Sequence, residues 1–260
     1  MILISDLDKT LIYSDKEKKL KGEKDYLCVE YKDNSPLSYM TRQAYDYLFE
    51  LNKYIEFIPC TARSLEQLNR ISFLKELNLK YIICFNGCEI YKDNKLDLEY
   101  DKMINKLIDK NKNISLLKLY SKKYPKLRIR SFNDYYLEIR LNDISQKDDI
   151  LVNLKQNSLL IDYDIFCVST KIYLIPKIVN KQMAIDYLKT KETFGKVYAL
   201  GDSEIDKSFI HNSDYGFVPS HYTFSIDKDN IYKSPYIGIL GGEDILNAAI
   251  AKMKEEIHLK

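Results

Sequence analysis

The stretch MILISDLDKT, residues 1–10, opens the chain and decides the predicted fold. Its apolar run Ile2–Ile4 has the length and β-branched content of a buried strand. Two carboxylates follow at once, at Asp6 and Asp8. Residues that come directly after a buried parallel strand lie at the edge of the sheet where ligands bind. We therefore predict an α/β fold whose first strand carries two carboxylates at its carboxyl end.

Apolar runs and helical patterns alternate downstream of this strand. Strands are expected at Ile55–Pro59 and Tyr81–Phe85, with helices after Thr41 and over Ser64–Leu77. This alternation predicts parallel strands joined by right-handed crossovers. The same alternation returns from Asn180, with a final helix from Glu243. The polar segment 13–40 shows no helical stripe, and its role stays open apart from a strand expected at Tyr26–Tyr31.

Between these two parallel segments the pattern changes. A lysine-rich helix is expected over Asp101–Lys122, after short strands that include Leu96–Leu98. The runs Leu127–Phe132 and Tyr135–Leu141 predict an antiparallel hairpin. We predict a Rossmann-like parallel-sheet core interrupted by an inserted α+β domain, with the core formed by residues 1–86 and 178–260 and the insertion by residues 87–177.

The composition excludes several classes of protein. Lys and Arg total 40 against 38 Asp and Glu, a formal charge of +2, and the lysines are scattered, so no nucleic-acid partner is expected. A hydrophobic content of 45% argues against disorder, and no apolar run is long enough for a membrane span. The first residues do not resemble a secretory signal, and five Cys without a CxxC pair favour reduced thiols. We expect a cytoplasmic protein of open oligomeric state.

Four separated segments carry residues suited to chemistry. Two carboxylates one residue apart, Asp6 and Asp8, can divide the work of attack and proton transfer. Thr61 lies between a strand and a helix, where a hydroxyl and backbone amides can hold phosphate. Lys181 begins a helix, from which its ammonium can reach the strand ends. The last segment is Gly201-Asp202-Ser203-Glu204-Ile205-Asp206, whose two aspartates offer the oxygen ligands that magnesium prefers.

These four motifs, in this order, resemble those of the haloacid dehalogenase superfamily of phosphohydrolases. More narrowly, the chain is similar to the Cof-type, sucrose-phosphatase-like branch, whose cap domain lies between the threonine and lysine motifs. The insertion at 87–177 occupies that place, and Thr61-Ala62-Arg63 followed by Phe85-Asn86-Gly87 is also similar to that branch. The resemblance implies a hydrolase core with an α+β cap. His221 follows the fifth core strand, where the family often has an Asn-Ala pair.

The resemblance also implies a role for each motif residue. Asp6 would attack phosphorus and form an aspartyl-phosphate, and Asp8 would protonate the leaving alcohol and then activate water. Thr61 and Lys181 would hold the phosphoryl oxygens. Mg²⁺ would be held by Asp6, Asp8, Asp202 and Asp206, the last directly or indirectly. The resemblance implies magnesium-dependent hydrolysis of a small phosphate monoester, and we expect the substrate to be a sugar phosphate.

A set of arginines is predicted to contact the substrate. In the expected hairpin Arg128, Arg130 and Arg140 alternate with apolar residues, which brings them to one face together with Glu138. An ordinary exposed sheet face is the alternative interpretation. The full set of predicted substrate-binding residues is Arg63, Asn86, Arg128, Arg130 and Arg140.

Two other functions remain open at this point. A phosphomutase of the same superfamily shares the aspartyl-phosphate step but returns the phosphoryl group to its substrate. A non-catalytic module that binds a phosphate ligand or a protein partner is the alternative from another class. The motif aspartates, Thr61 and Lys181 are all present, which argues against loss of turnover.

Overall fold

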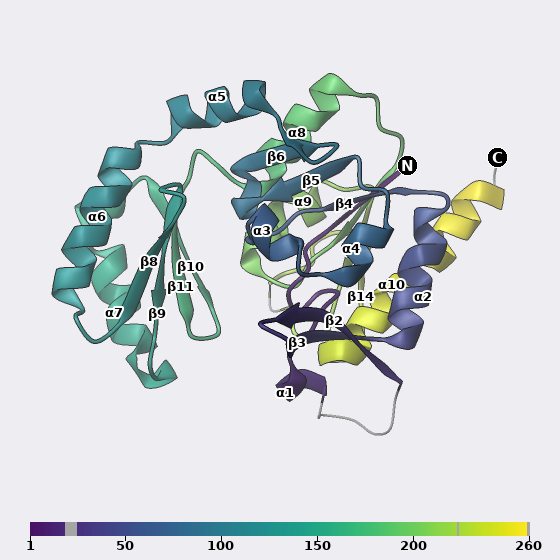
Figure 1. Ribbon diagram of the computed structural model, residues 1–260, viewed down its shortest axis with the longest axis horizontal. Helices are drawn as coiled ribbons and strands as arrows, with labels where there is room; N and C mark the ends of the chain where they lie inside the picture. Colours follow the sequence, from purple (N-terminus) through teal and green to yellow (C-terminus); the bar gives the residue numbers. More distant parts are fainter. Residues whose placement is uncertain (19–24, 223, 259–260) are drawn as a thin grey trace. The chain divides into compact units, whose positions relative to one another are not determined.

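The computed structural model describes residues 1–18, 25–222 and 224–258 and shows two compact units (Figure 1). The first comprises Met1–Leu96 and Lys181–Lys260, and the second comprises Asp97–Asn180. These units differ slightly from the predicted core and cap, whose boundaries stay a prediction. Within the described residues, no helix has the length and apolar character needed to cross a membrane.

The first unit is built on a five-stranded parallel sheet, which confirms the predicted fold class. Its order is β14-β13-β12-β1-β4, so the first strand of the chain lies between two others. The edge strand β14 has only three residues, and the sequence patterns did not predict it. The strands are β1 (Ile2–Ser5), β4 (Glu56–Pro59), β12 (Val197–Leu200), β13 (Tyr215–Val218) and β14 (Ile231–Lys233).

Seven helices belong to this unit in its described part. Thr41 is the N-cap of α2, as predicted, and its side chain accepts a hydrogen bond from the Ala44 amide at 3.0 Å. Helices α2 and α10 pack against each other and share one buried cluster with Leu3, Phe57 and Phe217 of the sheet. The helices are α1 (Asp15–Lys18), α2 (Arg42–Asn52), α3 (Leu65–Leu68), α4 (Ser72–Glu76), α8 (Lys181–Lys191), α9 (Lys207–His211) and α10 (Gly238–His258).

Two of the predicted long helices are wrong. The expected helix Ser64–Leu77 is broken into α3 and α4, because Ile71 is extended and forms a β-bridge with Glu30. The expected helix Asp101–Lys122 is two helices, α5 (Leu98–Leu107) and α6 (Lys110–Lys123), since Ile108 is extended and Asp109 caps α6. The final helix begins at Gly238, five residues before the predicted start.

Smaller elements complete the first unit. An isolated parallel bridge between Cys60 and Ile83 joins β5 to the end of β4, and β5 pairs antiparallel with β6. The expected strand Leu96–Leu98 is only β7, because Leu98 already begins α5. The remaining elements are the hairpin β2 (Tyr26–Lys32) and β3 (Ser35–Thr41), the strands β5 (Tyr81–Cys84), β6 (Glu89–Lys92) and β7 (Lys95–Leu96), and the 3-10 helices η1 (Phe85–Gly87) and η4 (Glu204–Asp206).

The second unit is an antiparallel sheet in the order β10-β11-β9-β8 with α6 and α7 on one side (Figure 1). Its own buried cluster joins Leu116 and Leu154 of these helices to Leu137 and Ile172 of the sheet. The predicted hairpin over 127–141 is confirmed. The unit also contains α5 and the elements β8 (Arg128–Phe132), β9 (Tyr136–Arg140), η2 (Ile144–Gln146), α7 (Lys147–Lys155), η3 (Ser158–Leu160), β10 (Tyr163–Val168) and β11 (Lys171–Pro176).

Candidate active site

The two aspartates after β1, Asp6 and Asp8, lie in different surroundings. The amides of Leu11 and Ile12 both donate to the Leu7 carbonyl at 2.9 Å, which closes the loop tightly. Asp6 is buried at the end of the strand, whereas the Asp8 side chain is 54% exposed. The two carboxylates therefore differ in burial, which is compatible with the predicted division between attack and proton transfer.

Three carboxylates meet where β1 and β12 end. Oxygen atoms of Asp6, Asp202 and Asp206 lie within 4.8 Å of one another, and all three residues are buried. Gly201 permits this approach, because a Cβ there would lie 2.6 Å from the Asp206 Cβ. Since β1 and β12 are parallel neighbours, their carboxyl ends bring together residues that are far apart in the sequence.

Lys181 is the cation of this cluster. It is the first residue of α8 and is buried, and its Nζ lies 2.8 Å from Asp6 Oδ1 and 2.6 Å from Asp206 Oδ1. The other oxygen of Asp206 accepts hydrogen bonds from the Asp202 amide and from both the amide and the hydroxyl of Ser203. Asp206 is therefore occupied in holding Lys181 and the Asp202–Ser203 turn, which favours an indirect part for it at a metal.

The three carboxylates of this cluster outnumber its one ammonium. Burial raises the pKa of Asp6 well above its usual value, with the nearby carboxylates adding to the effect and Lys181 opposing it. Burial likewise raises the pKa of Asp202, opposed by His221, whose Nε2 lies 3.4 Å from Asp202 Oδ2. With all three carboxylates ionised, the cluster and the Lys181 ammonium would carry a formal sum of −2. A divalent cation would neutralise that sum, and the all-oxygen donors suit magnesium.

Thr61 and Asn86 form a second polar group beside the strand ends. Thr61 follows β4, and its carbonyl accepts a hydrogen bond from the Asn86 amide at 2.9 Å. Asn86 has a φ of +56° and is only 1% exposed, yet neither its side-chain oxygen nor its nitrogen has a hydrogen-bond partner among the described residues. Buried side-chain amides rarely lack hydrogen-bond partners, so the Asn86 side chain is a candidate for binding a ligand.

Arg63, which is predicted to contact the substrate, binds Asp8 in the structure. Its Nε and Nη2 each donate to one oxygen of Asp8, both at 2.7 Å, and its Nη1 donates to Glu30 at 2.8 Å. A substrate contact of Arg63 stays a prediction. The sequence patterns did not single out Glu30, although it is the one carboxylate in a predicted strand that is otherwise mostly apolar.

The three arginines of the second unit lie on the hairpin as predicted. In its register Arg130 faces Glu138 and Arg128 faces Arg140. Arg130 Nε lies 3.0 Å from Glu138 Oε1, and Arg140 Nε lies 3.9 Å from the same atom. Glu138 is thus held between two guanidinium groups. A role for this face in substrate binding stays a prediction.

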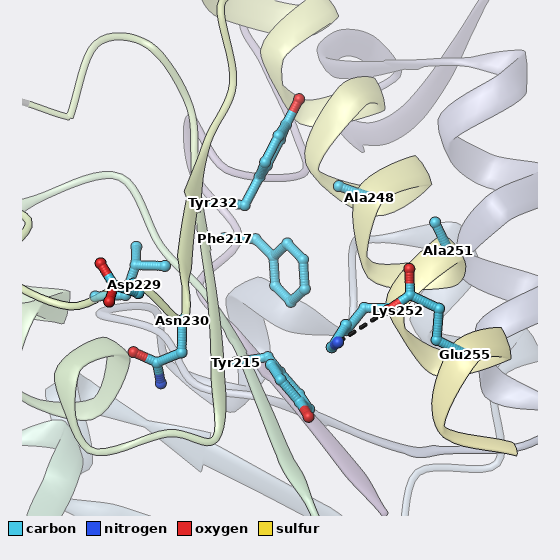
Figure 2. Close-up of a pocket in the computed structure, with 10 residues that line it drawn as sticks. Tyr215, Phe217, Asp229, Asn230, Tyr232, Ala248, Ala251, Lys252 and Glu255 are labelled. Atoms are coloured by element: carbon cyan, nitrogen blue, oxygen red, sulfur yellow. Dashed lines mark hydrogen bonds and ion pairs between the residues drawn. The ribbon is translucent and has the colours of Figure 1, made fainter. Parts of the chain in front are cut away.

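A pocket elsewhere in the first unit has a different character. It lies beside β13, β14 and α10, has a volume of about 450 Å³, and is walled by the rings of Tyr215, Phe217 and Tyr232 (Figure 2). Lys252 and Glu255 form an ion pair at its rim. None of the predicted site residues lines it. The candidate active site is therefore the carboxylate cluster and not this pocket.

The parallel sheet, the aspartate pair after its first strand and the inserted α+β unit agree with the fold that the sequence motifs predicted. The sequence model of one family, described as sucrose-6F-phosphate phosphohydrolase, matches residues 1–225. The chain belongs to this family and is a phosphatase of the haloacid dehalogenase superfamily. No curated protein matches the chain in a direct sequence comparison.

Solved structures share this fold. The sucrose-phosphatase from Synechocystis sp., determined with sucrose and phosphate, has a TM-score of 0.60 and 17% identity over 98% of both chains. A haloacid dehalogenase-like hydrolase from Bacteroides thetaiotaomicron has a TM-score of 0.63 and 15% identity, over 97% of this chain and 98% of that chain. The C-terminal domain of trehalose-6-phosphate phosphatase from C. albicans has a TM-score of 0.59 and 14% identity, over 95% and 90%.

Proposed function

We propose that this phosphatase hydrolyses a small phosphate monoester, a sugar phosphate, with magnesium and through an aspartyl-phosphate intermediate. The observation that carries the proposal is the buried Asp6 beside Lys181 and Asp202 at the ends of β1 and β12. A sugar phosphate is favoured because the matching family and two of the structural relatives are named as phosphatases of sugar phosphates.

In the first step a carboxylate oxygen of Asp6 attacks phosphorus. The bond from phosphorus to the ester oxygen breaks, and that oxygen leaves with the electron pair and receives a proton from the Asp8 carboxyl. In the second step Asp8 takes a proton from water, whose oxygen attacks the phosphorus of the aspartyl-phosphate. The bond from phosphorus to the Asp6 oxygen breaks, which releases inorganic phosphate and restores the Asp6 carboxylate. Because Asp8 gives and then recovers one proton, the same residue serves both steps.

Lys181, Thr61 and Asn86 are the groups that would bind the phosphoryl oxygens. Lys181 would supply a fixed positive charge beside Asp6, and the side-chain amide of Asn86, which has no hydrogen-bond partner among the described residues, would supply a further donor. Fixed donors of this kind stabilise the charge that develops during transfer.

The cluster fits a magnesium ion by its chemistry. The side chains of Asp6 and Asp202 and the backbone carbonyl of Asp8 would hold the ion, with Asp206 supporting them through its contacts to Lys181 and Ser203. The ion would neutralise the repulsion between the anionic ester and the attacking carboxylate.

A phosphate-release assay on a panel of sugar phosphates and simple esters tests the proposal. We expect Asp6→Asn to lower kcat by about a thousandfold or more, because an amide cannot form the acyl phosphate. The control Asp46→Asn alters an exposed residue of α2 and should keep wild-type turnover. Wild-type activity in Asp6→Asn, or undiminished activity after exhaustive chelation, would contradict the mechanism. Conversion of one sugar phosphate into an isomer, without phosphate release, would identify a mutase.

A further inference from the structure

A bulge in the β2–β3 hairpin buries a carboxylate. The register of β2 against β3 shifts on both sides of Glu30. Such a shift changes the face to which a side chain points, and bulges often serve to aim a side chain. Glu30 is consequently 0% exposed, and its Oε2 accepts a hydrogen bond of 2.6 Å from the Ser38 hydroxyl.

Two arginines converge on this carboxylate. Arg63 Nη1 lies 2.8 Å from Glu30 Oε1, and Arg70 Nε lies 3.2 Å from the same oxygen. Arg63 is only 12% exposed, so its guanidinium is held within the protein. A buried carboxylate that receives two guanidinium groups restrains their directions, because moving either would weaken the pairing of a buried charge.

Arg63 in turn orients Asp8. Its Nε and Nη2 bind the two oxygens of Asp8 side by side, both at 2.7 Å. The guanidinium is planar, so a third contact to Glu30 sets the plane in which the other two nitrogens lie. The Asp8 side chain is 54% exposed, and packing alone does not set its direction. The line of contacts Glu30–Arg63–Asp8 does.

We propose that Glu30 is a positioning residue for proton transfer, acting through Arg63 on Asp8. The proposal rests on the function proposed above, in which Asp8 protonates the leaving oxygen. The proposal also assigns a role to the β2–β3 hairpin, because this hairpin is the part of segment 13–40 that contributes Glu30 and Ser38. Asp8 must lie within hydrogen-bond reach of the ester oxygen to deliver its proton as the bond to phosphorus breaks.

A misplaced Asp8 has a particular kinetic signature. An alkyl alcohol, such as the hydroxyl of a sugar, leaves poorly unless it is protonated. p-Nitrophenolate leaves well without a proton. Loss of position should therefore lower kcat/KM for alkyl phosphates far more than for p-nitrophenyl phosphate, and should steepen the dependence of kcat/KM on the pKa of the leaving alcohol. A merely structural defect lowers both kinds of substrate alike.

The experiment compares Glu30→Gln with the wild type on a series of alkyl and aryl phosphates. We expect kcat/KM for the alkyl esters to fall by about tenfold or more, with less than a threefold change for p-nitrophenyl phosphate. Glu192→Gln is the matched control, because Glu192 also lies between two cations and a hydroxyl, those of Lys80, Lys92 and Tyr81. Its profile should equal that of the wild type. In an Asp8→Asn background, Glu30→Gln should add no further loss, since the residue through which it acts is gone.

Each outcome decides one of the two proposals. A wild-type enzyme that hydrolyses no phosphate ester refutes the proposed function. An active wild type, with equal losses on both kinds of ester in Glu30→Gln or a full additional loss in the Asp8→Asn background, overturns the role of Glu30 alone. If Glu30→Gln does not fold, Ser38→Ala takes its place, because it frees the same carboxylate from its 2.6 Å hydrogen bond. A steeper leaving-group dependence in that variant supports the proposal, and the wild-type dependence refutes it.

Discussion

Lys181 stabilises the buried carboxylate of Asp6 by its positive charge. Burial by itself would lower the pKa of Lys181, but Asp206 and Asp6 outweigh that effect and raise it. The lysine therefore stays charged, which a carboxylate at this depth needs as a partner. It does not complete the neutralisation, because Asp202 and Asp206 add two further negative charges. Repulsion among the carboxylates therefore lowers the stability of the folded protein, and a bound cation would reduce this repulsion.

The raised pKa values of Asp6 and Asp202 predict how stability depends on pH. Between the ordinary value of 3.8 and the raised value, the folded state holds protons that the unfolded state has lost. Stability is thus present at low pH and is lost as the pH rises through the folded pKa. Asp6→Asn has no carboxyl group to ionise, so in a chelator at about pH 8 we expect it to unfold about 2–4 °C above the wild type.

Thermal unfolding from about pH 5 to about pH 8 measures this difference. The advantage of Asp6→Asn should shrink as the pH falls, and millimolar magnesium should shrink it too, because the ion binds the complete carboxylate cluster more tightly. Parallel pH profiles for the two proteins, with or without magnesium, would contradict the proposed charge imbalance.

At the scale of elements, helix α10 packs closely against the loop after β1 at a glycine, Gly242. A Cβ at Gly242 would lie 2.7 Å from the Thr10 carbonyl oxygen and 2.7 Å from Tyr13 Cε2. The helix can therefore approach the loop only without a side chain at this position. The Tyr13 hydroxyl donates to the same Thr10 carbonyl at 3.1 Å, so both groups that Gly242 approaches are hydrogen-bonded to each other.

Gly242→Ala should accordingly disturb both stability and activity. Overpacking usually lowers the free energy of unfolding by about 1–3 kcal/mol. The better helix propensity of alanine offsets up to about 1 kcal/mol of this loss. kcat should fall as well, because the displaced loop carries Asp6 and Asp8. Urea unfolding and phosphate release measure the two effects. Gly195→Ala is the control, since its Cβ would meet nothing closer than 3.5 Å; equal behaviour of the two variants would refute the prediction.

At the scale of the molecule, the two compact units differ in how the chain builds them. Asp97–Asn180 is continuous and has a buried cluster of its own. The other unit needs both ends of the chain, because β1 lies between β4 from its first segment and β12 from its second. We therefore expect the fragment 97–180 to fold alone and the fragment 1–96 to remain unfolded.

Circular dichroism during heating tests this expectation. The fragment 97–180 should unfold in a single cooperative transition, because its sheet and the helices α6 and α7 bury their apolar faces within the fragment. The fragment 1–96 should show no such transition, since β1 would lose its neighbour β12. A non-cooperative profile for 97–180 would show that this unit depends on the rest of the chain.

Short-range patterns predicted much of the fold. The apolar run before Asp6, the cap at Thr41 and the hairpin over 127–141 depend on neighbours in the sequence, and the structure confirms all three. The pattern was wrong at the helix expected over Ser64–Leu77. There Ile71 pairs with the distant Glu30, and a β-bridge across the chain overrides local helix propensity.

The sequence by itself determined the parallel core, the interruption by an α+β segment and the aspartates at the ends of the strands. It could do so because strand ends, turns and motif spacing are local properties of the chain. Only the tertiary structure decided what Arg63 binds. Its partners Asp8 and Glu30 lie 55 and 33 residues away, and Glu30 reaches it because a bulge turns that side chain inward. No periodicity in the sequence reports such a turn, because a single extra residue in a strand reverses the face to which every later side chain points.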